Sequence, residues 1–419
     1  MTAIIQNGSA GFLARYEAIR ELLPGDPALR DAAAQAFRAA GLPGGTSPRR
    51  AEAWKYTSLR PVAETPFHTP DEDRSDVAAL LARAPDLDTP LVVFVDGRFR
   101  GDLSRTPRGF TRFADQPDFG TLTWPDRDPM VALNTMLAED GAELRIPAGV
   151  DAGVVRLLSL GSGTTAFHPR HMIRLAPGAR LVVLETAIGD GAYLHNPVTE
   201  VHVAAGAHLT HVRLQDEAPA AFHLATIYVD VAETGTYDGF TLALGGRVSR
   251  AEFHARLAGP DAVAHLNGAQ LLAGTQHADF TSVARHAAPN GTSRQTVKNV
   301  LAGRARGVFQ GRIEVARDAQ KTDGYQMNQA LLLSPEAEVD TKPELEIFAD
   351  DVKCSHGATV GELDSEQLFY LRSRGIRDGE ARSILIRAFL QEALDEVTHD
   401  AIRGILEDSV QRWWERQAA

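Results

Sequence analysis

Leu175-Ala-Pro-Gly-Ala-Arg-Leu181 and Val203-Ala-Ala-Gly-Ala-His-Leu209 are two copies of one short pattern in the middle of the chain. Weaker copies follow at Val231-Ala-Glu-Thr-Gly-Thr-Tyr237 and Leu257-Ala-Gly-Pro-Asp261, and Ile146-Pro-Ala-Gly149 precedes them. The first residues of successive copies are 29, 28, 28 and 26 positions apart. Strand-like alternation of polar and apolar residues fills the intervals, with Gly, Pro, Asn and Asp at the turns. The repeating unit is therefore built of strands and turns alone.

The length and content of this repeat limit the possible folds. The unit is too short for a propeller blade and lacks the helices of ankyrin or leucine-rich repeats. It fits one coil of a β-helix, in which each coil stacks on the previous one and buries a continuous inner stripe. A β-sandwich is the competing fold, because it also contains short strands at regular spacing. The nearly constant interval across the copies favours the parallel β-helix.

The chain divides into three regions by pattern. Helical periodicity runs from 10 to 41, a Pro- and Asp-rich stretch follows to 90, and a strand with a turn begins at Leu91. Strand-like texture continues to about 363, and three helical segments follow. We expect an N-terminal helical region at 1–90, a β-helix core at 91–363 and a C-terminal helical region at 364–419. The last helices either cap the open end of the solenoid or present an apolar stripe to a partner.

Composition excludes several classes of protein. Hydrophobic residues make up 44% of the 419 residues and charged residues 23%, as in globular proteins. The net charge of −12 argues against nucleic-acid binding. A single cysteine cannot form an internal disulfide or a four-cysteine metal site. The apolar runs are too short to span a membrane and the start lacks a secretory signal pattern, so we expect a cytoplasmic protein. Walker, Gly-x-Ser-x-Gly and Cys-x-x-Cys motifs are absent, so the chain has no P-loop ATPase of its own.

The cysteine lies in the sequence Lys353-Cys354-Ser355-His356. On a strand, residues two apart point to the same face, so Cys354 and His356 would present a sulfur and an imidazole side by side. The neighbouring Lys353 is expected to lower the pKa of the thiol. Such a pair suits iron–sulfur, zinc or copper binding. Two ligands do not complete a four-coordinate site, so the others would come from a second chain or from inorganic ligands. The alternative is a small buried thiol beside a structural histidine.

Histidines are dense in the repeat region, where eleven of the 14 lie between His168 and His286. His195 and His223 are 28 positions apart, which is one repeat, so they could stack on adjacent coils and hold zinc. The simpler interpretation is that these histidines face outward from the solenoid.

Three groups of segments resemble one family, the SufB/SufD proteins of iron–sulfur cluster assembly. The first is an N-terminal Glu-x-Trp-Lys-Tyr-Thr signature, the second a core motif, and the third the segment around the cysteine. The N-terminal signature is Glu52–Thr57. The core motif comprises Lys298–Leu301, Gly307–Gly311 and Lys321–Gln329. The third group comprises Leu331–Ser334, Lys342–Ile347 and Val352–Gly361. Within this family the chain resembles SufD more than SufB, because it is short, carries the Trp-Lys-Tyr-Thr signature and has no cysteine besides Cys354.

The resemblance implies a right-handed parallel β-helix with helical ends that pairs with a SufB-like paralogue and docks a SufC-like ATPase. It implies that His356, with Cys354 beside it, contributes ligands to a nascent iron–sulfur cluster shared with the partner, and that no cofactor is permanently bound to the isolated chain. The ATPase would dock on the C-terminal helices, for which we select Leu368, Tyr370, Leu385 and Phe389. The chain would then be a scaffold subunit rather than an enzyme.

Two other functions remain open from the residues alone. One is a stand-alone β-helix enzyme, either zinc-dependent or carbohydrate-active. The other is a structural homodimer formed through the edge of the solenoid, and the isolated chain of the resembled family can also be expected to pair with itself.

Overall fold

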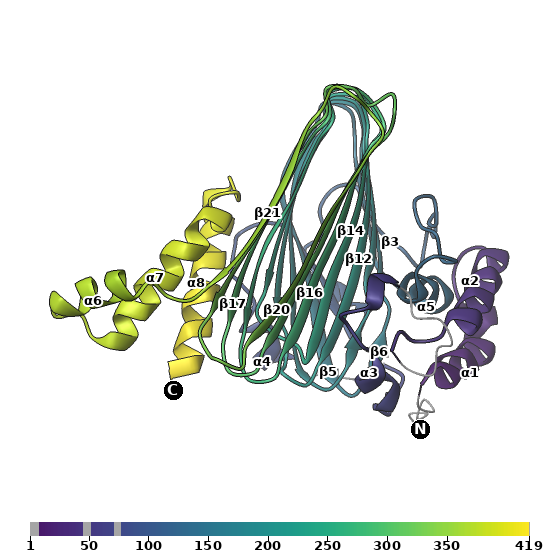
Figure 1. The fold of residues 1–419 in the computed structure, drawn as a ribbon. Helices are drawn as coiled ribbons and strands as arrows, with labels where there is room; N and C mark the ends of the chain where they lie inside the picture. Colours follow the sequence, from purple (N-terminus) through teal and green to yellow (C-terminus); the bar gives the residue numbers. More distant parts are fainter. Residues whose placement is uncertain (1–7, 45–51, 71–76, 419) are drawn as a thin grey trace.

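The computed structural model describes residues 8–44, 52–70 and 77–418, and its core is a solenoid of about eight turns. Two sheets of mainly parallel strands form its walls (Figure 1). In spatial order the ten-stranded sheet contains β2 (Arg98–Phe99), β1 (Leu91–Val95), β5 (Asp151–Gly163), β8 (Arg180–Gly191), β11 (His208–Asp216), β13 (Thr236–Ala243), β15 (Val263–Leu272), β17 (Thr292–Leu301), β19 (Asp323–Leu332) and β21 (Lys353–Gly361).

The second wall is an eleven-stranded sheet. Its main path contains β20 (Glu338–Ile347), β18 (Arg306–Val315), β16 (His277–His286), β14 (Val248–Leu257), β12 (Phe222–Val231), β10 (Val198–Val203), β7 (Arg170–Leu175), β4 (Ala142–Ile146) and β3 (Phe110–Arg112). The short strands β6 (Ala166–Phe167) and β9 (Leu194–His195) extend it beside β12. Each coil of the solenoid contributes one strand to each wall.

The sequence repeat and the strand register coincide. Leu175 pairs with Ile146 on one side and with Val203 on the other, and the row continues through Val231 to Leu257. The copies of the pattern therefore occupy equivalent positions in successive coils, which confirms the predicted parallel β-helix. Because register in a sheet fixes which face each side chain takes, the repeat also determines which residues point inward.

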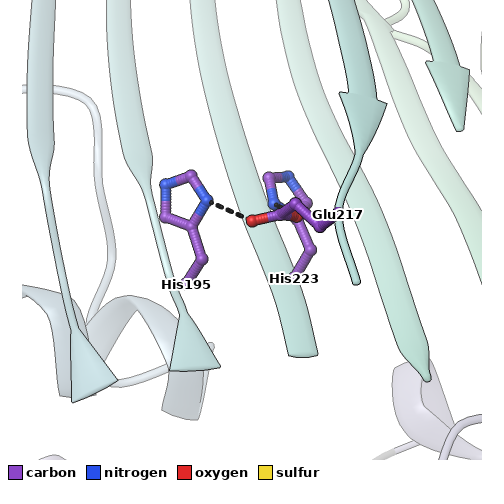
Figure 2. A group of neighbouring side chains, drawn as sticks. All are labelled: His195, Glu217 and His223. Carbon is purple, nitrogen blue, oxygen red and sulfur yellow. Dashed lines mark hydrogen bonds and ion pairs between the residues drawn. The ribbon is translucent and has the colours of Figure 1, made fainter. Parts of the chain in front are cut away.

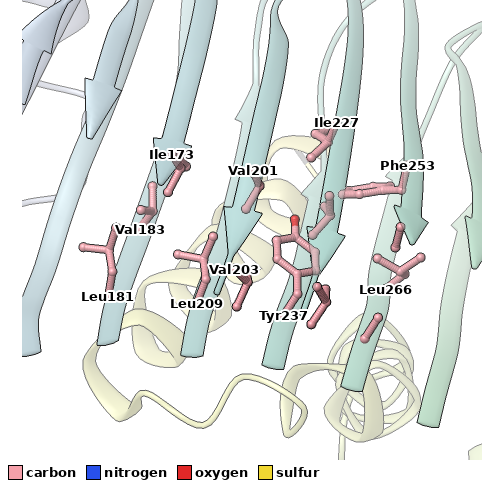
Figure 3. Close-up of a cluster of buried hydrophobic side chains, with 14 of the residues drawn as sticks. Ile173, Leu181, Val183, Val201, Val203, Leu209, Ile227, Tyr237, Phe253 and Leu266 are labelled. Atoms are coloured by element: carbon pink, nitrogen blue, oxygen red, sulfur yellow. The ribbon is translucent and has the colours of Figure 1, made fainter. Parts of the chain in front are cut away.

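The interior is apolar through most of the solenoid (Figure 3). Alternate residues of both walls fill it, and they are almost completely buried. The labelled members of this cluster are Ile173, Leu181, Val183, Val201, Val203, Leu209, Ile227, Tyr237, Phe253 and Leu266. Burial of about 1.5–3 kcal/mol per large side chain makes this stack the main source of stability.

Most helices of the N-terminal region cover the outer face of the eleven-stranded sheet. They are α1 (Ser9–Ile19), α2 (Pro27–Ala40), α3 (Arg60–Glu64) and, just before the coils, α5 (Pro129–Leu137), and their apolar residues form one cluster with Phe222, Leu224 and Val248 from β12 and β14. The short helix α4 (Ala78–Leu81) packs instead on β1, β5 and β8 of the ten-stranded sheet. The short 3-10 helices are Arg20–Leu22, Glu52–Trp54 and Gly101–Leu103.

The C-terminal helices lie beside the other wall of the solenoid (Figure 1). They are α6 (Ser365–Ser373), α7 (Asp378–Leu394) and α8 (Asp400–Ala418). Helices α7 and α8 pack on outward-facing residues of the ten-stranded sheet such as Leu214, Leu242 and Val300. The expectation that these helices cap the open end is therefore wrong, because a wall of the solenoid offers them a larger apolar surface. No helix in the described ranges is long and apolar enough to cross a membrane.

One turn of each coil needs a left-handed backbone. Gly178 and Gly206 have φ values of 69° and 64° in the first copies of the repeat, whereas Thr234 has φ 54° at the equivalent position. A β-branched residue is strained in this conformation, by about 1–2 kcal/mol. An added Cβ at Gly206 would meet only Thr234 Oγ1, at 3.8 Å, so conformation rather than crowding governs this site.

We predict that Thr234→Gly raises the midpoint of urea unfolding, and that the reverse change Gly206→Thr lowers it. The free energy of unfolding should fall by about 1–2 kcal/mol in Gly206→Thr. It should rise by only about 1 kcal/mol or less in Thr234→Gly, because the freedom of glycine in the unfolded chain offsets part of the relieved strain. Equal midpoints for the two variants and the parent chain would contradict the assigned strain.

Candidate functional site

Cys354 and His356 lie on β21, the last strand of the ten-stranded sheet. The register pairs Cys354 with Gly324 and His356 with Gln326, which is fully buried in the preceding coil. Both side chains therefore continue the inward-facing row, as the two-residue spacing predicts. Cys354 packs beside Ile313 in a small apolar cluster and is half-buried, while His356 is exposed.

The final coil leaves this row open. Within the described part of the chain, no strand follows β21 in one sheet or β20 in the other. The two edges differ in composition: β20 contains Pro343 and several charged residues, whereas β21 has no Lys, Arg, Asp or Glu from Ser355 to Val360. The inward-facing thiol and imidazole thus lie at an open end of the solenoid, where a further chain has access to them.

The surroundings of Cys354 alter its expected acidity. Burial raises the pKa of the Cys354 thiol, and the Asp323 carboxylate raises it further, although a hydrogen bond from the Gly324 backbone opposes them. Lys353 precedes the cysteine on the strand and so points to the opposite face. The expectation that Lys353 lowers this pKa is wrong, because sequence neighbours on a strand do not share a face.

The interior contains polar pairs in the coils next to this end. His286 Nε2 lies 2.8 Å from Ser293 Oγ, and burial lowers the pKa of His286 to about 4. Further along, Asn299 donates to Asn328 at 2.7 Å. In one inward row, Leu181, Leu209 and Tyr237 of earlier coils are followed by Ala264 and then by Ser293. That change of inward residue type is the sequence signal that could have marked this end of the solenoid.

The four selected docking residues differ in exposure. Tyr370 on α6 is 57% exposed, and its neighbour Phe369, which we did not select, is 72% exposed. Leu368 and Leu385 are half-buried. Phe389 on α7 packs against the outer face of the ten-stranded sheet, where the Lys298 ammonium lies 4.6 Å from the centroid of its ring. Within the described C-terminal helices, the large exposed aromatic residues therefore lie on α6.

Lys298 and its partner attach α7 to the solenoid. The Lys298 side chain is only 3% exposed and forms an ion pair with Glu392 on α7. Between α7 and α8 lies a groove of about 320 Å³, lined by Ile384, Arg387, Ala388, Gln391 and Glu407 among others.

The N-terminal signature has a structural position of its own. Trp54 is buried, and the Arg250 guanidinium lies 4.3 Å from its ring centroid. Thr57 Oγ1 donates to Asp279 at 2.5 Å, and Glu52 pairs with Lys342 at 3.1 Å. The signature thus anchors the N-terminal region on the outer face of β14, β16 and β20. It borders a hollow of about 550 Å³ whose opposite side carries Trp124 and Tyr228.

His195 and His223 stack on adjacent coils, as their spacing predicts. They pair in register, and their ring centroids are 4.8 Å apart (Figure 2). Both are buried, so the simpler interpretation that they face outward is wrong for this pair. Glu217 lies between them, in a turn outside the repeat, where no sequence pattern marks it as a ligand.

We predict that Cys354 reacts slowly with iodoacetamide at neutral pH, because a raised pKa leaves little thiolate. Asp323→Asn removes a neighbouring negative charge and should speed the reaction, whereas Lys353→Met should leave it unchanged. Alkylation rates measured against pH by mass spectrometry test this. A Cys354 pKa below that of an ordinary thiol would refute it.

The comparisons with known proteins agree with this architecture. A family model described as SUF system FeS cluster assembly, SufBD core domain, matches residues 158–389. The chain is 34% identical to the iron–sulfur cluster assembly protein SufD of Escherichia coli, covering 86% of this chain and 87% of that protein. It is 30% identical to a SufBD family protein of Synechocystis, over 86% of each chain, and 33% identical to the chloroplastic protein ABCI7 of Arabidopsis thaliana, over 74% of this chain and 67% of that one. The chain therefore belongs to the SufBD family of iron–sulfur cluster assembly proteins.

Proposed function

We propose that this chain is a scaffold subunit for iron–sulfur cluster assembly that pairs with a SufB-like paralogue and docks a SufC-like ATPase. Its family membership supports the role in cluster assembly. The observation that carries the finer proposal is the open last coil, where a thiol and an imidazole face inward on an unpaired edge strand.

The proposed ligands fit a cluster that is cargo rather than a resident group. Cys354 and His356 supply sulfur and nitrogen donors that suit iron. Two donors cannot complete a cluster site, so the partner chain supplies the remaining ligands. The raised pKa of Cys354 is consistent with this sharing, because metal binding would favour loss of the thiol proton.

The paralogue would add to the exposed edge of β21. An unpaired strand offers a row of backbone donors and acceptors, and a second β-helix can continue the sheet through them. This pairing brings the partner's side chains against the inward-facing row that contains His356. The absence of Lys, Arg, Asp and Glu from Ser355 to Val360 supports β21 as the edge that pairs.

The ATPase would dock on the C-terminal helices. Phe369 and Tyr370 on α6 are the large exposed aromatic residues there, and aromatic residues dominate interface energies. Helices α7 and α8 connect this surface to the ten-stranded sheet through their apolar contacts and the pair Lys298–Glu392. A force applied at α6 would therefore reach the wall that ends in β21.

The first test is to tag the chain in its native host and purify it anaerobically. Recovery of a SufC-like ATPase and a SufB-like paralogue is the expected result. Recovery of the chain alone, with both partners expressed, would overturn the scaffold proposal and leave a stand-alone enzyme or a homodimer.

We predict that His356→Ala leaves the complex with both partners intact but lowers its iron and sulfide content by about tenfold or more, because one ligand is lost. Iron and acid-labile sulfide in the purified complex are the measurements. Ser355→Ala, a neighbour on the opposite face of β21, is the matched control and should change neither. Full cluster content in the His356 variant would sink the ligand assignment.

We also predict that Tyr370→Asp weakens binding of the ATPase at least about tenfold while the β-helix keeps its thermal stability. Glu366→Ala on the same exposed helix is the control. Phe389→Asp should instead lower thermal stability as well, because it disrupts packing over Lys298. Unchanged ATPase affinity for Tyr370→Asp, measured by calorimetry, would place the docking surface elsewhere.

A further inference from the structure

A second group of ligand-type side chains lies inside the solenoid, apart from Cys354 and His356. His195 ends β9, His223 lies on β12, and Glu217 belongs to the turn between β11 and β12. The three side chains are at most 3% exposed. They come from two adjacent coils and point toward one another (Figure 2).

The donor atoms converge on one point. Glu217 Oε1 lies 3.1 Å from His195 Nδ1, and Glu217 Oε2 lies 2.7 Å from His223 Nδ1. One ligand atom from each residue lies within 4.8 Å of the other two, the only such trio among the residues that the structure describes. Two imidazole nitrogens and one carboxylate form a donor set typical of first-row divalent metals, including zinc and iron(II).

Two buried carboxylates, Glu185 and Glu217, lie at this group. Arg213 pairs with Glu185 at 3.3 Å, which leaves Glu217 with the imidazoles of His195 and His223 and with a hydrogen bond from the Gln215 amide at 3.1 Å. A buried carboxylate is costly unless its charge is compensated, and a divalent cation held by these three side chains would supply the compensation.

One polar atom at the cluster lacks a partner, because His195 Nε2 is buried without a hydrogen bond. The Tyr193 hydroxyl lies at the same carboxylate, since burial, the Glu217 charge and a hydrogen bond with Glu217 raise the pKa of Tyr193. A buried polar atom without a partner calls for an explanation, such as a missing water or ion.

We propose that His195, Glu217 and His223 bind one first-row divalent cation. Three protein ligands leave one position of a tetrahedral site for a water molecule. Arg213 Nη2 lies 3.2 Å from His223 Nε2. Binding of a cation through Nδ1 would put the imidazole proton on Nε2, so Arg213 would give up its contact with His223 and keep its pair with Glu185. The site ties Glu217, in an irregular turn, to the strands of two coils.

The test uses the full chain with Cys354→Ser and His356→Ala, so that the other candidate ligands are absent. The metal-free protein is titrated anaerobically with Co²⁺ as a spectroscopic probe, and Zn²⁺ and Fe²⁺ are then added as competitors. We expect about one ion per chain, with cobalt d–d absorption and no thiolate-to-cobalt band. The competition distinguishes a zinc site from an iron site.

Glu217→Gln and His195→Gln should each weaken Co²⁺ binding at least about tenfold. His265→Gln is the matched control, because His265 contacts Asp238 at 2.7 Å in a similar His–carboxylate pair on the outer face. Circular dichroism checks that the variants keep their β-structure. If Glu217→Gln does not fold, the test uses His195→Gln alone and measures melting temperatures. Zn²⁺ should then raise the melting temperature of the chain that keeps His195 but not that of His195→Gln.

Two results would overturn the proposal. One is that the chain takes up none of the three ions above the level of the His195→Gln variant. The other is that Glu217→Gln and His195→Gln bind the ion as tightly as the chain that keeps both residues. In either case the protein contacts of Glu217, including the hydrogen bond from Gln215, hold this carboxylate without an ion.

Discussion

The structure depends on the parallel pairing of each strand with the equivalent strand of the next coil. This pairing fixes the face that every side chain takes, so Ile146, Leu175, Val203, Val231 and Leu257 form one buried row. The same constraint orients the chemical groups. His195 meets His223 because they are in register one coil apart. Cys354 faces inward because its register partner Gly324 occupies an inward-facing position. The functional geometry is therefore a result of register rather than of any single loop.

The repeat made the fold predictable from the sequence, because its interval matches the register of the coils. The common face of Cys354 and His356 was predictable for a related reason, since alternation on a strand is a local property. The effect of Lys353 on the thiol was not, because it depends on which face the lysine takes. The acidity of Cys354 follows instead from its own burial and from Asp323, a residue of the previous coil.

Two other features could not be obtained from sequence patterns. An apolar helix stripe fits an open solenoid end and a solenoid wall equally well, so the position of α7 and α8 was not determined by their periodicity. What identifies the wall is Lys298, a buried cation on β17 whose partner Glu392 lies 94 residues later. Glu217 was missed for a similar reason, because it lies outside the repeating pattern and meets the two histidines only in three dimensions.

The unequal edges of the last coil also bear on aggregation. The edge at β20 is protected by Pro343 and by alternating charges, which discourage the addition of another strand. The edge at β21 has no such protection between Ser355 and Val360. A chain whose β21 is left uncovered therefore exposes an adhesive strand, and raising its concentration favours aggregation at this end of the solenoid.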